Sequence, residues 1–312
     1  MFVPVVNMDN QPLMPTTPSR ARRWILSRKA TPFWKKGVFC VRLNIRTLEN
    51  KQDIVVGIDP GSKKEGYTVK GNAHTYLNIQ ADAVTHVKDA VETRRNMRKA
   101  RRYRKCPCRQ PRFNRAKGSL APSTKARWQW KLRILNWLKK LFPITHTVVE
   151  DIKTKTTGQR KWDKTFSPLE VGKKWFYSLL TNLTLKQGWE TKELRDSLGL
   201  KKTSNKLSKS FDAHCVDSWV LANYVVGGHV KPDNKDILYL KPLRFHRRQL
   251  HALQPSKDGV RRTYGGTMSM GLKRGSLVKH NERGLAYVGG TSKGRISLHN
   301  VVDRTIFLGE GL

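Results

Sequence analysis

The chain has 312 residues, which is enough for one large domain or for two to three small ones. It carries 62 Lys and Arg residues against 23 Asp and Glu residues, a formal net charge of +39. Such an excess repels itself in an isolated compact protein, and nucleic acid is the simplest polyanion that would neutralise it. No run of about 18 apolar residues is present, so neither a transmembrane helix nor a membrane partner is expected.

The four Cys residues are too few for a disulfide-rich secreted domain of this length. Cys106 and Cys108 form a Cys-Pro-Cys pair without a second pair at zinc spacing, so no zinc site is expected there. Residues 1–15 lack the basic stretch and apolar core of a signal peptide. A reducing cytoplasm is therefore the expected location.

Residues 1–50 are expected to form a short basic module. A helix is predicted from Pro18 to about Arg28, opened by Thr17 or Pro18. The total charge of the chain indicates that the basic side chains of this segment face phosphates. These side chains are Arg20, Arg22, Arg23, Arg28 and Lys29.

Three strands are predicted over residues 53–59, 66–70 and 73–80, joined by tight turns as in a hairpin meander. Asp59 ends the first of them, directly before a Pro-Gly turn. Burial of an unpaired carboxylate is costly, so this position requires a cation, a metal ion or a hydrogen-bonding ligand.

A helix is predicted over residues 82–105, and eight of the twelve residues from Arg94 to Lys105 are basic. Like charges four positions apart destabilise a helix, and here they occur on all sides of it. The pattern indicates a helix that lies between nucleic-acid backbones. Its candidate phosphate contacts are Arg94, Arg95, Arg98, Arg101, Arg102 and Arg104.

The next segment, residues 123–143, has the pattern of an amphipathic helix that Ser123 or Thr124 could cap. Its apolar stripe is expected to lie in the core rather than to stack on bases. The stripe consists of Trp130, Ile134, Trp137, Leu138 and Leu141.

An apolar run at residues 144–152 predicts a strand that ends in Glu150 and Asp151. Helices are predicted over residues 169–188 and 210–228, with a basic loop between them. Short strands and Gly-rich turns after residue 235 predict a small β-barrel or an antiparallel module.

Four residues could form one catalytic constellation: Asp59 and Glu150 at strand ends, with His214 and Asp217 three positions apart on one helix face. Oxygen ligands suit Mg²⁺ or Mn²⁺. Two such ions roughly 4 Å apart could activate a water and stabilise the leaving oxygen of a phosphodiester.

Each of these residues also has an ordinary structural alternative. Asp59 could cap the turn that follows it, and Glu150 could pair with Lys153. His214 could be an interior histidine whose hydrogen bonds are satisfied, and Asp217 could pair with a lysine. The four taken together, in a chain suited to hold a polyanion, favour the metal site.

The order of these motifs resembles the split RuvC nuclease of RNA-guided DNA endonucleases. The opening "QPLMPTTPSRARRWI" resembles the first module of the IscB and IsrB proteins of bacterial insertion sequences. "GIDPGSK" resembles their first RuvC motif, and "RRNMRKARRYRK" resembles their bridge helix. "RRTYGGTMSMGLKRGSLVKH" with "GLAYVGG" resembles their C-terminal module, which reads a short motif beside the DNA target.

The resemblance implies an α/β fold with a split RNase H-like RuvC core. It divides the chain into a basic N-terminal (PLMP) module at 1–50, RuvC part I at 51–81, the Arg-rich bridge helix and linker at 82–120, RuvC parts II and III at 121–232, and a small β-rich C-terminal module at 233–312. Further candidate nucleic-acid contacts in the last module are Arg247, Arg248, Arg261 and Arg262.

The resemblance also implies partners and roles. The partners are a long structured guide RNA and a double-stranded DNA target with a short flanking motif, bound by a protein that is monomeric in the ribonucleoprotein. Asp59, Glu150 and Asp217 would be metal ligands for two Mg²⁺ or Mn²⁺ ions. His214 would be a further ligand, or the group that orients or deprotonates the attacking water.

IscB proteins carry an HNH nuclease between their second and third RuvC motifs, and its chemistry requires a catalytic histidine. Residues 151–210 contain neither His nor Cys, and these 60 residues are too few for that insert. The chain therefore resembles IsrB, which has RuvC alone. The resemblance implies a nickase that cuts the displaced, non-target strand in a bacterial cytoplasm.

Two other functions remain open from the residues alone. A RuvC-type junction nuclease that works without guide RNA would explain the acidic residues but not the Arg-rich helix or the N-terminal module. A non-enzymatic RNA-binding protein would explain the charge but not the four metal-type residues. An ATPase of the actin-like branch is least favoured, because no second Asp-Gly phosphate loop is present.

Overall fold

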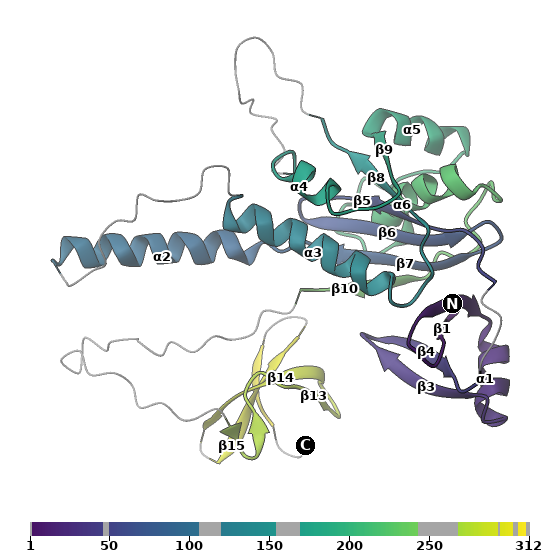
Figure 1. Cartoon of the computed structure of the whole chain (residues 1–312). Helices are drawn as coiled ribbons and strands as arrows, with labels where there is room; N and C mark the ends of the chain where they lie inside the picture. Colours follow the sequence, from purple (N-terminus) through teal and green to yellow (C-terminus); the bar gives the residue numbers. More distant parts are fainter. Residues whose placement is uncertain are drawn as a thin grey trace, which may run out of the picture. The chain divides into compact units, whose positions relative to one another are not determined.

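The computed structural model divides the chain into two compact units, Met1–Leu240 and Lys241–Leu312 (Figure 1). The structure describes residues 2–45, 50–105, 120–153, 169–242, 268–292, 294–301 and 305–309.

The first unit begins with a small four-stranded sheet in the order β2-β1-β4-β3. The predicted module at residues 1–50 thus contains four strands in addition to the predicted helix. Its elements are β1 (Val3–Val6), β2 (Pro12–Thr16), α1 (Pro18–Leu26), β3 (Ala30–Lys35) and β4 (Val38–Leu43).

The predicted start of α1 is confirmed. Pro18 occupies the first turn, and the Thr17 hydroxyl accepts a hydrogen bond from the backbone N–H of Arg20. The helix ends at Leu26, two residues before the expected position. Only Ala21 of this helix is buried, so its arginines face solvent.

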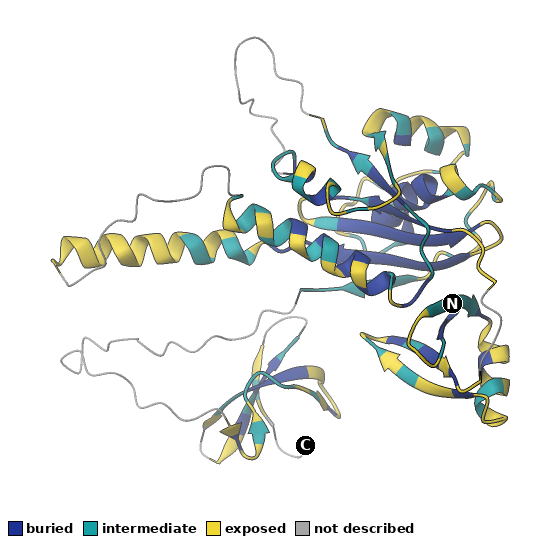
Figure 2. Cartoon of the chain, viewed as in Figure 1, coloured by how far each residue is buried: buried dark blue, intermediate teal, exposed yellow. Residues whose placement is uncertain are grey.

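A six-stranded mixed sheet forms the core of the first unit, in the order β10-β7-β6-β5-β8-β9. Its strands are β5 (Ile54–Asp59), β6 (Lys64–Gly71), β7 (Thr75–Asp82), β8 (His146–Asp151), β9 (Leu183–Gln187) and β10 (Ile237–Leu240). The expected antiparallel meander of β5, β6 and β7 is confirmed. Strand β8 runs parallel to β5, so both strands end at the same edge of the sheet. Figure 2 shows these central strands as almost entirely buried.

The helix predicted over residues 169–188 is wrong for most of its length. Only α4 (Lys173–Tyr177) is helical, and Leu183–Gln187 form the edge strand β9, parallel to β8. Asn182 adopts a positive φ of 50° and interrupts any helix at that point. The segment that follows it pairs with β8, which provides the backbone hydrogen bonds that a helix would have supplied.

The division at 232/233 also differs from the structure. It assigns Ile237–Leu240 to the C-terminal module, yet these residues form β10 and pair in parallel with β7. The boundary between the two compact units lies between Leu240 and Lys241 instead. The short apolar segment completes an exposed sheet edge, a role that its sequence alone does not indicate.

Helix α3 (Pro122–Leu138) packs on the core sheet with the predicted apolar stripe. Ile134, Trp137 and Leu138 are buried. Neither Ser123 nor Thr124 caps the helix; it begins with Pro122 in the first turn and Ala121 at the cap position, without a side-chain hydrogen bond.

A buried ion pair fixes α3 to the sheet. The ammonium of Lys131 lies 2.5 Å from a carboxylate oxygen of Glu65 on β6, and both side chains are fully buried. The Tyr67 hydroxyl donates to the other oxygen of Glu65. Because each charge would be uncompensated without the other, loss of either partner is costly.

Helix α2 (His86–Tyr103) has no buried residue. Every residue from Glu92 to Lys105 is exposed, and Figure 2 shows the distal part of the helix as exposed on all sides. The predicted helix and its charge on every face are confirmed. In the part of the chain that the structure describes, no element covers this charge.

Helices α5 (Gly188–Ser197) and α6 (Phe211–Val226) pack against each other, and α6 lies directly on the sheet. The close approach of α6 depends on two strand glycines. A Cβ at Gly57 would lie 1.9 Å from the carbonyl oxygen of Ser218, and a Cβ at Gly66 would lie 1.8 Å from that of His214. Only glycine fits at these two positions.

The second unit contains short antiparallel strands, as predicted. Four of them form a sheet in the order β13-β14-β15-β16, with Ala286, Val288, Ile296 and Leu298 in its core. The strands are β11 (Met268–Ser269), β12 (Leu272–Lys273), β13 (Leu277–His280), β14 (Gly284–Ser292), β15 (Arg295–Asn300) and β16 (Ile306–Gly309).

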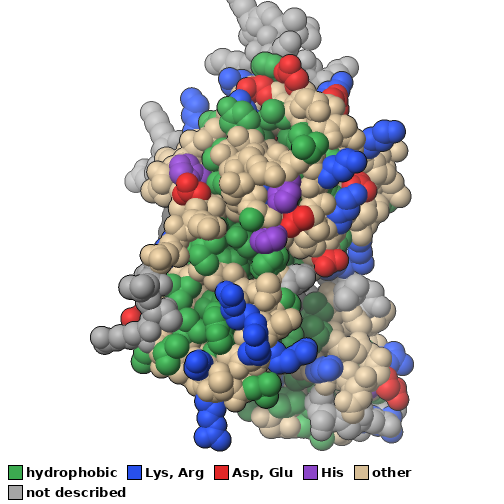
Figure 3. Space-filling view, turned by 90° about the vertical axis from the view of Figure 1, so that its right-hand side faces the viewer, with side chains coloured by type: hydrophobic (Ala, Val, Ile, Leu, Met, Phe, Trp, Pro, Cys, Tyr) green, Lys and Arg blue, Asp and Glu red, His purple; other side chains and the backbone are tan. Residues whose placement is uncertain are grey.

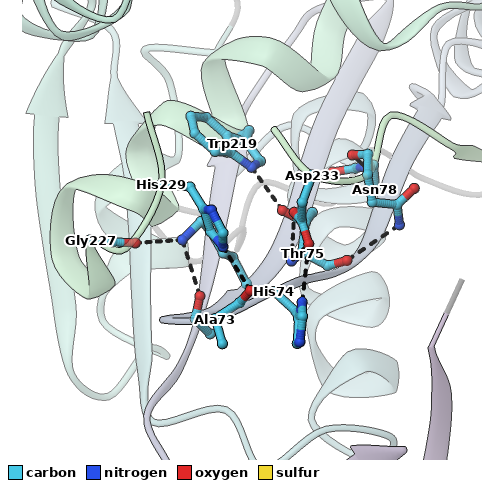
Figure 4. Close-up of polar contacts among 11 residues, drawn as sticks. Ala73, His74, Thr75, Asn78, Trp219, Gly227, His229 and Asp233 are labelled. Carbon is cyan, nitrogen blue, oxygen red and sulfur yellow. Dashed lines mark hydrogen bonds and ion pairs between the residues drawn. The ribbon is translucent and has the colours of Figure 1, made fainter. Parts of the chain in front are cut away.

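A polar cluster ties the start of β7 to α6 and to the segment before β10 (Figure 4). Asp233 accepts two hydrogen bonds from the backbone N–H of Thr75, at 3.0 and 3.2 Å, and lies 3.3 Å from Nδ1 of His74. The Trp219 indole donates to the Thr75 hydroxyl at 2.9 Å. Burial alone would raise the pKa of Asp233, but hydrogen bonds from Thr75 and His74 outweigh it and lower the pKa.

We predict that Gly57→Ala destabilises the first unit by about 3 kcal/mol or more, because its Cβ cannot fit beneath α6. Urea unfolding followed by circular dichroism measures this loss. Gly290→Ala is the control, since its Cβ would meet no atom closer than 3.9 Å. Equal stability of Gly57→Ala and the wild type would mean that α6 does not approach the sheet this closely.

Asp233→Asn is expected to lower stability by roughly 1–2 kcal/mol at pH 7, because the charge-assisted hydrogen bonds are lost. The folded pKa of Asp233 lies below the unfolded value of about 3.9. Its stabilisation is therefore complete above about pH 4 and is lost as the pH falls through the folded pKa. The difference in the free energy of unfolding between Asp233→Asn and the wild type should therefore become smaller at about pH 3. A difference that grows on acidification would contradict this, and Asp89→Asn on α2 is the control.

Candidate metal centre

Three carboxylates meet at one edge of the core sheet. Asp59 ends β5, Glu150 lies near the end of β8, and Asp217 projects from α6. One oxygen from each lies within 4.8 Å of the others. The Asp59 side chain is 16% exposed and that of Asp217 is 5% exposed. The structure therefore brings together three of the four residues predicted from the sequence.

The local backbone explains how these side chains meet. Asp59 and Glu150 share an edge because β5 and β8 are parallel neighbours. Gly57 lets α6 approach, so that Asp217 reaches the same edge. Gly188 opens α5 and leaves room for Glu150, since a Cβ there would lie 2.8 Å from the Oε1 atom of that side chain.

Two basic side chains neutralise the carboxylates. The Lys202 ammonium lies 2.5 Å from Asp217 Oδ2 and 3.4 Å from Asp59 Oδ2. The Arg195 guanidinium donates to Asp217 Oδ1 at 2.6 Å. The alternative in which Asp217 pairs with a lysine is thus observed, but within a cluster of three carboxylates rather than as an isolated surface pair.

The electrostatics of the centre favour a bound cation. Burial raises the pKa of Glu150 to about 8, and the negative charges of Asp59 and Asp217 add to this shift. Burial also raises the pKa of Asp59, although Lys202 opposes the shift. The pKa of Lys202 is raised because the carboxylates outweigh the effect of burial. Carboxylates with raised pKa values in one site gain stability from an added positive charge.

His214 lies outside the group of three carboxylates. It is buried on α6, and its Nε2 lies 2.9 Å from the carbonyl oxygen of Lys206. This contact matches the alternative of an interior histidine with satisfied hydrogen bonds. The role of His214 as a metal ligand stays a prediction.

The donor set fits a hard divalent cation. All three ligands are carboxylate oxygens, which Mg²⁺ and Mn²⁺ prefer. The Lys202 ammonium bridges two of the carboxylates, so a positive charge is already accommodated at this point. Asp59, Glu150 and Asp217 could therefore bind a metal ion.

Arg195 and Lys202 were not predicted from the sequence. Lys202 falls in a stretch read as a basic loop, where one lysine among many carries no distinguishing pattern. Arg195 lies on α5, which is separated from α6 by a loop. Their roles depend on the packing of α5 against α6, which residue spacing does not reveal.

The predicted nucleic-acid contacts have different outcomes. The arginines of α1 and α2 are exposed, as expected for phosphate contacts, but no partner is present to test them. Figure 3 shows many Lys and Arg side chains on the surface that faces the viewer, with fewer acidic and His side chains among them. Arg247, Arg248, Arg261 and Arg262 lie outside the described residues, as do Cys106 and Cys108.

We predict that Lys202→Met raises the affinity of the protein for Mn²⁺ by about tenfold or more. The ammonium occupies a position close to the expected ion, and two unit charges about 4 Å apart repel by about 4 kcal/mol at a surface-like dielectric constant. Electron paramagnetic resonance of free Mn²⁺ measures the affinity without any cleavage assay. Lys201→Met, an exposed neighbour, is the control. Equal affinities for both variants would show that Lys202 does not compete with the metal.

None of the helices in the described part of the chain is both long and apolar enough to cross a membrane. No curated protein matches the chain. A protein-family model described as RRXRR protein matches residues 3–162, about half of the chain. This domain is found in IscB- and IsrB-like RuvC nucleases. The matched segment includes the basic N-terminal sheet, the Arg-rich helix, Asp59 and Glu150, and the chain therefore belongs to the RRXRR family.

Proposed function

We propose that this chain is a guide-RNA-directed DNA endonuclease that nicks the displaced, non-target strand. The observation that carries the proposal is the meeting of Asp59, Glu150 and Asp217 at one sheet edge, in a member of the RRXRR family. The strand ends and the covering helix α6 support an RNase H-like RuvC core for the first unit. The net charge of +39 supports a nucleic-acid substrate.

Two Mg²⁺ or Mn²⁺ ions held there would activate a water and stabilise the leaving oxygen of the phosphodiester. Asp59, Glu150 and Asp217 hold the ions in this proposal. Lys202 and Arg195 keep the carboxylates together in the metal-free protein and then provide positive charge beside the cleaved phosphate. His214 acts as a further ligand, or it orients or deprotonates the attacking water.

The basic surfaces support a structured guide RNA as the permanent partner. Helix α2 exposes every residue from Glu92 to Lys105 and has no acidic counterpart along its second half. An RNA that surrounds this helix would neutralise it on all sides. The guide would then read the target by base pairing, and the second unit would read the short flanking DNA motif.

A single cutting centre supports a nick rather than a double-strand break. Among the described residues, the three carboxylates are the only group of this kind that could hold a metal ion. Residues 151–210 contain no His or Cys that could supply an HNH nuclease. Because guide pairing occupies one DNA strand, the displaced strand is the single strand that is free to enter the site.

The test is a supercoiled plasmid with a matched target, incubated with the protein, its copurifying RNA and Mg²⁺. We expect an open circle, with breaks mapped by primer extension to the displaced strand only. Asp59→Asn should slow cleavage by about a hundredfold or more, since metal stabilisation of the transition state is worth several kcal/mol. Asp196→Asn, whose side chain is 57% exposed, should cut normally.

Other outcomes separate the proposed function from its alternatives. Rapid linear product, or breaks confined to the guide-paired strand, would contradict nicking of the displaced strand. Metal-dependent cleavage of a DNA junction without RNA would favour a junction nuclease. RNA of one defined size without any metal-dependent cleavage would favour a non-enzymatic RNA-binding protein.

A further inference from the structure

The turn of the β3–β4 hairpin holds a lysine in a conformation that lysine rarely adopts. Lys35 pairs with Val38, so Lys36 and Gly37 form a two-residue turn, with φ values of 51° and 82°. Two positive φ values define a type I′ turn, whose first position favours Asn, Asp or Gly. A lysine in the left-handed region is strained, and such strain tends to persist where the side chain has a function.

Lys36 lies among other cations. Burial lowers the pKa of its ammonium, and the positive charges of Arg133, Lys140 and Lys35 lower it further. Arg133 lies on α3 and Lys140 follows its end, so the cluster joins the hairpin to that helix. In the described ranges, none of these four side chains has an ion pair. A group of like charges without a counter-ion favours the binding of an anion.

The Trp137 ring lies close to the Lys36 ammonium. The Lys36 ammonium lies 5.7 Å from the ring centroid of Trp137, which is 4% exposed. The indole N–H of Trp137 is buried and has no hydrogen-bond partner among the described residues. A buried donor without a partner costs about 1–3 kcal/mol. The charged groups around Lys36 are all cations, which complement the oxygens of a phosphate.

An exposed aromatic side chain stands two residues before Lys36. Trp34 is 71% exposed on β3, the edge strand of its sheet, and contacts Phe39 edge-on at 5.4 Å between ring centroids. An exposed aromatic ring is a typical stacking platform for an unpaired base.

We propose that Lys36, Arg133 and Lys140 form a phosphate-binding site for RNA, with Trp34 stacking on an unpaired base next to that phosphate. The site is separate from the metal centre and from the Arg-rich helix α2. Only the choice of RNA as the polyanion rests on the proposed function. The stacking surface favours RNA, because loops of a structured RNA present unpaired bases, whereas the bases of duplex DNA are stacked on one another.

The test compares binding of two labelled probes over a range of salt concentrations: a single-stranded RNA of about 20 nucleotides and a DNA duplex of similar length. The full chain carries Lys36→Gln, Arg133→Gln and Lys140→Gln together. The matched control carries Lys192→Gln, Lys231→Gln and Lys235→Gln, which remove the same charge from other positions. Trp34→Ala is measured separately. Circular dichroism checks that each variant is folded.

The triple variant should reduce the slope of log K against log salt for RNA by about 0.7 for each phosphate interaction that it removes, to about 2 in total. The control triple variant should reduce this slope by less than half as much. Trp34→Ala should weaken RNA binding by about fivefold or more and leave duplex binding within twofold, since stacking on one base contributes about 1–3 kcal/mol. Equal slopes for the triple variant and its control would overturn the phosphate site. Equal weakening of RNA and duplex DNA binding in Trp34→Ala would overturn the RNA assignment.

These results are independent of cleavage. If the triple variant binds RNA with the shallower slope while the wild type cuts no DNA, the binding site stands and the proposed nuclease function fails. If the slopes match but guided nicking is observed, the nuclease function stands and this site fails.

Discussion

Three carboxylates that repel one another lie at one edge of the core sheet. The packing and charge distribution around them in the first unit depend on this repulsion. Asp59, Glu150 and Asp217 come within 4.8 Å only because α6 lies almost directly on the backbone of the sheet. That approach requires glycine at two strand positions, Gly57 and Gly66, where a Cβ would overlap a helix carbonyl. Packing thus brings the three carboxylates together. Other residues must then offset the cost of burying these charges side by side.

Arg195 and Lys202 provide that stabilisation in different ways. Arg195 is held on a helix that packs against α6, and of the three carboxylates it contacts Asp217. Lys202 comes from a loop, remains 30% exposed and bridges two of the carboxylates. A charge on a flexible stem at the open side of the site can be displaced by a metal ion, whereas the helix-borne guanidinium cannot move far. The arrangement is therefore suited to exchange one cation for another without loss of the fold.

The sequence predicted the parts of this site that local pattern determines. An apolar run ending in Asp59, another ending near Glu150 and a helix carrying Asp217 were enough to place three ligands at one edge. The prediction from local sequence pattern was wrong where pairing with a distant segment determines the secondary structure. Strand β9 forms because β8 offers an open edge, and β10 is recruited by β7, although neither short segment has a distinctive periodicity. His214 shares a helix face with Asp217, yet its Nε2 contacts the Lys206 carbonyl and its ring lies outside the carboxylate group.

Positive charge is matched in one part of the first unit and unmatched in others. The acidic groups of the centre are matched by nearby cations, but the exposed arginines of α2 and the cluster around Lys36 have no such match among the described residues. Helix α2 buries no residue and carries like charges four positions apart, so packing and charge pairing contribute little to its helical form. A polyanion that contacts several of its faces would stabilise it. A partner with both a continuous backbone and unpaired bases would satisfy α2 and the β3–β4 hairpin at once, and structured RNA has both properties.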